Sequence, residues 1–235
     1  ETNRKLKQDL EKSSLQFNNE LEDYFNNKYP KAKITYKARP NPKTGELYEI
    51  DVRHFIPLGA GEIAWDYLKG YSQMRDAKAN PSLDAKMKAA EEFIKQKFRW
   101  TSDFALGKNE YWLTFAESMA QLDKTGVVEG DCEDGAVAMY VVALALGVPY
   151  YRMRINAGNV KTSSGDVGHC YLTYCRESDD LFTLCDWCLY ITEEPLAERQ
   201  SHRDLKDRYG VWFSFNSKYS FSQAPLDNFK FTVVQ

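Results

Sequence analysis

The chain has 235 residues, of which 43% are hydrophobic and 28% charged, and its formal net charge is −3. This length and composition allow a sizeable core, in one large domain or in a compact domain with an extension. The slight acidity excludes a whole-chain attraction for nucleic acid or an acidic membrane, and no run reaches the roughly 20 apolar residues of a membrane span.

The N-terminal 62 residues are predicted to form a helix followed by a hairpin. Apolar residues recur at helical spacing in the first 29 positions, at Leu6, Leu10, Phe17, Leu21 and Tyr24/Phe25. Residues 33–39 and 47–55 predict two short strands around a turn. The helix either covers the core or docks a partner. We assign residues 1–62 to this extension and 63–235 to the main domain.

The next part of the chain is predicted to be helical. Helical spacing returns at residues 63–70 and 83–98, and a short helix is expected at 115–122. Residues 132–146 are apolar on nearly every side, which is typical of a buried central helix. Gly147, with Pro149 close behind, predicts its end.

Three strands are predicted after this helix, at residues 150–155, 169–174 and 181–186. Residues 156–168 have a turn-like composition. The order of a helix followed by an antiparallel sheet predicts an α+β fold. The aromatic-rich residues 206–235 are expected to add strand or coil that covers the sheet.

Cys132 lies in the string Gly-Asp-Cys-Glu-Asp-Gly, at the predicted start of the central helix. Unpaired backbone N–H groups and the helix dipole favour a negative charge there, so we expect a lowered thiol pKa. The chain has five cysteines, so at least one thiol is left after any pairing. Cys132 is therefore a candidate nucleophile; a small buried residue at a helix start is the alternative.

A nucleophilic thiol needs a base and a group that orients the base. His169 opens the strand after the helix and Asp186 closes the next one, so antiparallel neighbours can bring them together. His54 lies in the hairpin and His202 in a charged segment that we expect to be exposed. The order of these residues along the chain predicts a catalytic triad of Cys132, His169 and Asp186. The alternatives are that His169 is a core histidine and that Asp186 is a turn residue.

The other four cysteines lie close together in the sequence, at Cys170, Cys175, Cys185 and Cys188. Their spacing allows a zinc site, a cross-strand disulfide or buried thiols. Strand alternation places them on two faces of the sheet, which favours buried thiols.

Residues 98–189 resemble the bacterial transglutaminase-like cysteine proteinases of the transglutaminase-like superfamily. The resemblance rests on Tyr-Trp at 111–112, Gly-Asp-Cys-Glu-Asp at 130–134, Leu-Gly-Val-Pro at 146–149, Gly-His at 168–169 and Asp186. Two positions depart from the family pattern: Gly135 replaces an aromatic residue, and Trp187 replaces an asparagine after the aspartate.

The resemblance implies a papain-like core and thiol chemistry, with Cys132 as nucleophile, His169 as base and Asp186 as orienting group. It implies that Asp131 and Glu133 bind calcium, although these carboxylates also suit a helix N-terminus. Trp112 either contributes to the oxyanion environment or belongs to the core. The chemistry itself requires no cofactor, and the family favours a periplasmic or extracellular location.

The sequence therefore predicts a cysteine peptidase that hydrolyses peptide bonds of a protein substrate. Two alternatives stay open. One is acyl transfer, as in a transglutaminase or deamidase, and the other is a structural module of a virion or surface complex that retains the fold. No feature indicates a nucleic-acid partner.

Overall fold

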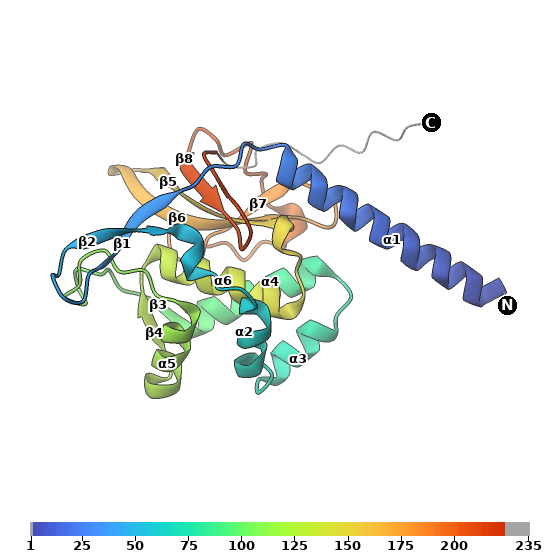
Figure 1. The fold of residues 1–235 in the computed structure, drawn as a ribbon, viewed down its shortest axis with the longest axis horizontal. Coiled ribbons are helices and arrows are strands. Elements are labelled where there is room, and N and C mark those ends of the chain that lie inside the picture. Colours follow the sequence, from blue (N-terminus) through green and yellow to red (C-terminus); the bar gives the residue numbers. More distant parts are fainter. Residues whose placement is uncertain (1, 224–235) are drawn as a thin grey trace.

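In the computed structural model, which describes residues 2–223, a layer of helices covers one face of an antiparallel sheet (Figure 1). This layer consists of α2 (Ala60–Leu68), α3 (Ser72–Ala79), α4 (Leu83–Lys97), α5 (Phe115–Thr125) and α6 (Cys132–Leu146). Helix α1 (Thr2–Asn27) lies apart from this layer, and its Leu21 and Phe25 pack in a separate cluster with Cys175 and Phe182 of the sheet. The main sheet of these residues has the order β7-β6-β5-β8-β9, with β5 (Met153–Thr162), β6 (Gly165–Cys175), β7 (Phe182–Cys185), β8 (Tyr209–Phe215) and β9 (Ser220–Phe221). This arrangement confirms the α+β fold.

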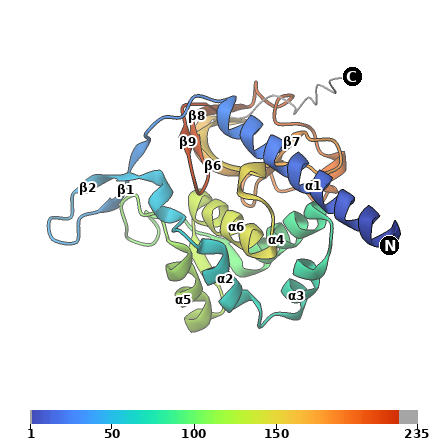
Figure 2. The same ribbon diagram turned by 45° about the vertical axis from the view of Figure 1, so that its right-hand side comes forward.

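Helix α6 is buried between the sheet and the outer helices, as its apolar sequence predicts, and α2 and α4 pack against it (Figure 2). Its ends are the predicted ones. The carboxylate of Asp134 accepts the backbone N–H of Asp131 at 3.2 Å, and Gly147 adopts a left-handed conformation with φ 98°. Strands β3 (Phe98–Trp100) and β4 (Val128–Gly130) pair in parallel, and β4 leads directly into the helix.

The turn-like interpretation of residues 156–168 is wrong. Strands β5 and β6 continue through this segment as one hairpin, in which Gly158 pairs with His169. On its other side β5 pairs with β8, so β8 extends the sheet and does not cover it. A Cβ on Gly158 would lie 1.9 Å from the carbonyl oxygen of Gly210. Glycine here permits close strand approach and marks no turn.

The N-terminal extension packs against the rest of the chain through both its hairpin and its helix. The hairpin of β1 (Thr35–Pro40) and β2 (Leu47–Asp51) contributes Ala38 to the core that contains α6, and Val52 and Phe55 directly after it join this core. The C-terminal part of α1 buries Leu21 and Phe25, while its N-terminal part extends beyond the other helices (Figure 1). A boundary at residue 62 stays a prediction.

Some features of the sequence lie outside the described parts of the chain. These are the side chains of Leu6, Leu10 and Phe17 in α1 and all of residues 224–235. Docking of a partner by α1 therefore stays a prediction. Among the helices of residues 2–223, none combines the length and the hydrophobicity of a bilayer-spanning segment.

Glu117 on α5 joins this helix to the hairpin through an ion pair with Arg39. Burial alone would raise the pKa of Glu117, but hydrogen bonds from Arg39 and Thr114 lower it from 4.5 to about 2. A lowered pKa stabilises the fold above the unfolded-state pKa, and this stabilisation is lost as the pH falls from about 4.5 towards 2. Because 36% of the Glu117 side chain is exposed, we expect its lowered pKa to contribute only about 1 kcal/mol to the free energy of unfolding at neutral pH.

We expect Glu117→Gln to lower the melting temperature by about 2–4 °C at pH 7. The difference from wild type should shrink as the pH falls below about 4.5. Glu129→Gln is the matched control, because Glu129 pairs with Arg99 at 3.3 Å between two largely exposed side chains. A Glu117→Gln effect that stays constant down to pH 2 would contradict the assignment.

Candidate active site

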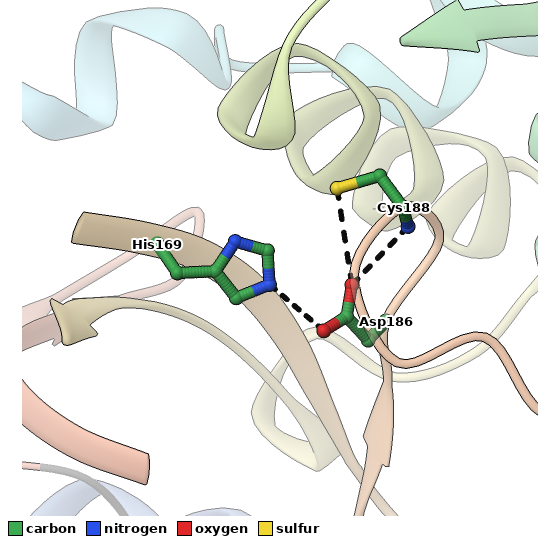
Figure 3. Close-up of side chains that lie close together, drawn as sticks. All are labelled: His169, Asp186 and Cys188. Atoms are coloured by element: carbon green, nitrogen blue, oxygen red, sulfur yellow. Dashed lines mark hydrogen bonds and ion pairs between the residues drawn. The ribbon is translucent and has the colours of Figure 1, made fainter. Parts of the chain in front are cut away.

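His169 and Asp186 form a buried pair on neighbouring strands. His169 lies on β6, Asp186 directly follows β7, and Nε2 of the imidazole is 2.8 Å from Oδ2 of the carboxylate (Figure 3). The two side chains are 4% and 1% exposed. The pair leaves Nδ1 as the ring nitrogen that is free of Asp186.

Asp186 is surrounded by donors. Oδ1 accepts the backbone N–H groups of Cys188 and Leu189, each at 3.2 Å. Oδ2 accepts the hydroxyl of Tyr209 at 3.3 Å in addition to His169. Burial alone would raise the pKa of Asp186, but the hydrogen bond and charge of His169, with the two backbone N–H groups, hold it below its ordinary value. The carboxylate is therefore anionic and fixed in orientation.

Cys132 is the first residue of α6 and lines the same cavity as His169, of about 230 Å³. A backbone hydrogen bond from Cys170 reaches its thiol, and the thiol donates to Oε2 of Glu133 at 3.2 Å. The predicted lowering of its pKa is wrong for this structure. Burial raises the pKa of Cys132 well above its ordinary value, and the charge of Glu133 raises it further.

Aromatic and acidic side chains complete the cavity. Trp112, Tyr36, Glu110 and Trp212 line it. The indole N–H of Trp112 donates to Oε1 of Glu110 at 2.9 Å, so this donor already has a partner. Burial raises the pKa of Tyr36 to about 12, and its hydroxyl therefore stays protonated at neutral pH. Sequence reasoning missed Tyr36, because the hairpin that carries it is remote in the chain.

Three carboxylates meet beside Cys132. Asp131 and Glu133 are joined by Asp103, which sequence reasoning missed, and their ligand oxygens lie within 4.8 Å of one another. Burial and the charge of Asp131 raise the pKa of Asp103 to about 6. Burial raises the pKa of Glu133 well above its ordinary value, and Asp131 raises it further.

This cluster fits a hard cation. Within the described chain, Oδ1 of Asp131 is buried without a hydrogen-bond partner, and a buried acceptor without a donor is costly. Oxygen ligands with a net negative charge are those that calcium prefers. Asp134 is engaged otherwise, because it accepts the N–H groups of Leu113 and Asp131 at 2.6 and 3.2 Å. The sequence stretch around Cys132 therefore supplies both a helix cap and candidate metal ligands.

The remaining cysteines and histidines lie as follows. All five cysteines are free, with Cys170, Cys175 and Cys185 buried. Cys188 contacts Asp186 through its backbone N–H and, at 3.9 Å, through its sulfur (Figure 3). The expected exposure of His202 is wrong: it is fully buried, and Nε2 lies 2.9 Å from the hydroxyl of Tyr171.

Comparison with known proteins shows which fold these residues are built on. No family model and no curated protein matches the sequence. Calcium-bound LapG of Legionella pneumophila is similar in structure, with 17% identity and a TM-score of 0.51 over 74% of this chain and 92% of LapG. A second LapG structure has 18% identity and a TM-score of 0.50 over 69% and 87% of the two chains. EGTA-treated LapG has 17% identity and a TM-score of 0.50 over 71% of this chain and 87% of LapG. The chain has a transglutaminase-like fold.

Proposed function

We propose that this protein is a cysteine peptidase that hydrolyses peptide bonds of a protein substrate. The observation that carries the proposal is the buried His169–Asp186 pair, at 2.8 Å, whose histidine lines a cavity together with Cys132. A thiol at a helix start, a base and an anionic group that orients the base are the parts of a papain-like site. The sequence resemblance to the transglutaminase-like cysteine proteinases supports the same class.

In the proposed mechanism Cys132 loses its proton to Nδ1 of His169 and attacks the scissile carbonyl carbon. Asp186 fixes the imidazole through Nε2 and stabilises its positive charge. The oxyanion is bound by the backbone N–H of Cys132 and a second donor. Trp112 is the predicted donor, but its N–H is bonded to Glu110, and the protonated hydroxyl of Tyr36 is the better candidate.

Collapse of the intermediate breaks the C–N bond, and His169 returns the proton to the leaving amine. The acyl group then remains on Cys132 as a thioester. His169 next removes a proton from water, which attacks the thioester carbonyl. The C–S bond then breaks, the acid is released, and the proton on His169 returns to the thiolate of Cys132. The reaction needs no redox or group-transfer cofactor.

We further propose that Asp103, Asp131 and Glu133 bind calcium. The unpartnered oxygen of Asp131 supports this proposal, as does the calcium-bound state of the similar LapG structure. A bound divalent cation would offset the negative charge that raises the pKa of the Cys132 thiol.

The test of the function is product analysis with a peptide library and a labelled primary amine. We expect new peptide termini that appear with wild-type protein and not with Cys132→Ala. Because a thioester can also be attacked by an amine, label on glutamine side chains without peptide cleavage would indicate acyl transfer instead. Absence of both products, together with a thiol that resists alkylation, would favour a structural module.

A further inference from the structure

Gly135 lies inside helix α6, three residues after Cys132. Glycine is among the least favourable residues in a helix interior, because it gains no side-chain packing and loses the most backbone freedom. The helix continues Ala-Val-Ala-Met, so an alanine would suit the local sequence. The reason for glycine must therefore lie in a neighbouring element.

That neighbour is the indole of Trp187. A Cβ on Gly135 would lie 2.2 Å from both Cε2 and Nε1 of Trp187, and 2.7 Å from Cδ2. Real Cβ atoms do not approach other atoms so closely, so the indole occupies the space that any larger residue would need. Trp187 is 4% exposed and packs edge-on against Phe98, with ring centroids 5.9 Å apart. The indole of Trp187 therefore has little space into which it could move.

The same indole makes a directional contact with the nucleophile's own backbone. Nε1–H of Trp187 donates to the carbonyl oxygen of Cys132 at 3.0 Å. Trp187 also directly follows Asp186, whose carboxylate contacts His169. One side chain therefore connects the segment that carries Asp186, the orienting group of His169, to the helix start that carries the thiol.

We propose that Trp187 and Gly135 are positioning residues that fix Cys132 relative to the His169–Asp186 pair. This inference rests on the proposed thiol chemistry for its functional meaning. Trp187 holds the helix start by a hydrogen bond and by close packing, and Gly135 provides the space for that packing. A displacement of either segment changes the distance between nucleophile and base, on which the rate depends steeply.

The experiment is a double-mutant cycle with kcat, KM and the rate of Cys132 alkylation by iodoacetamide as readouts. We expect Gly135→Ala to lower kcat about 100-fold with KM little changed, because the added methyl displaces the helix start or the indole. In Trp187→Leu the indole is absent, so adding Gly135→Ala should cost no more than about 2-fold further. Trp187→Phe keeps most of the ring and loses the N–H, and we expect about a 10-fold loss of kcat.

Gly70→Ala is the matched control, because a Cβ there would meet nothing closer than 3.8 Å. Wild-type kcat in Gly135→Ala, or an equal cost of this change with and without Trp187, would overturn the proposal. So would a lowered melting temperature with unchanged kcat and alkylation rate.

The alkylation rate separates this proposal from the proposed function. If wild type cleaves no peptide while alkylation still shows the coupling between Gly135 and Trp187, the peptidase assignment fails and the positioning role stands. If peptide cleavage depends on Cys132 and His169 while the effects of the two substitutions are additive, the peptidase assignment stands and the positioning role fails.

Discussion

Replacing Cys132 by alanine is expected to abolish peptide hydrolysis, with a loss of at least about 10⁴-fold in kcat. Alanine removes the thiol of Cys132, which lines the cavity together with His169. His169→Ala should cause a comparable loss, because the effects of groups that act as one unit do not add. Asp186→Asn keeps the shape of the site but lacks the charge, and we expect a loss of about 10²–10⁴-fold. Kinetics on a peptide identified from the library measure all three.

Cys175→Ala is the matched control for the thiol. Cys175 is a buried cysteine at the C-terminal end of β6, and it packs in a cluster with Phe25 and Phe182. We expect it to keep wild-type kcat even if its melting temperature falls. Full activity of Cys132→Ala would exclude the proposed nucleophile. Loss of activity in Cys132→Ala with full activity in His169→Ala would instead exclude the proposed base.

Calcium is expected to stabilise this protein by a large margin. At a concentration 100 times the dissociation constant, a ligand that binds only the folded state adds about 2.7 kcal/mol. For a chain of this size that is about 5–10 °C in melting temperature. Magnesium should have a smaller effect, since it gives up its water ligands reluctantly. Scanning calorimetry in calcium, magnesium and EGTA measures the differences.

Asp131→Asn makes the calcium prediction specific. It removes one charge from the cluster with Asp103 and Glu133, so the variant should lose the calcium-induced shift. In EGTA it should melt at or above the wild-type temperature, because repulsion between carboxylates is relieved. Asp66→Asn is the control, as Asp66 is 71% exposed in an ion pair with Lys69, and it should respond to calcium like wild type. A normal calcium response of Asp131→Asn would contradict the site.

The sequence by itself determined the elements whose signals are local. Helix α6 begins at Cys132 and ends before Gly147 as predicted, because an acidic N-terminus, an apolar run and a terminal glycine act within a few residues. The order helix, strand, strand also placed His169 and Asp186 on neighbouring strands, since sequential antiparallel strands pair. The roles of these side chains in catalysis stay predictions.

Tertiary structure decided whatever depends on contacts between distant segments. Residues 156–168 have a turn-like composition, but β5 and β6 pair with each other through this segment, and residues 156–160 also pair with the distant strand β8. Asp103 joins Asp131 and Glu133, and Tyr36 enters the cavity, only because the chain folds back on itself. Gly135 and Trp187, the two positions at which the sequence departs from the proteinases that it resembles, lie in direct contact. The periodicity of a sequence indicates which side of a single helix or strand is buried. It does not indicate which other helix or strand packs against that side, and these features depend on that packing.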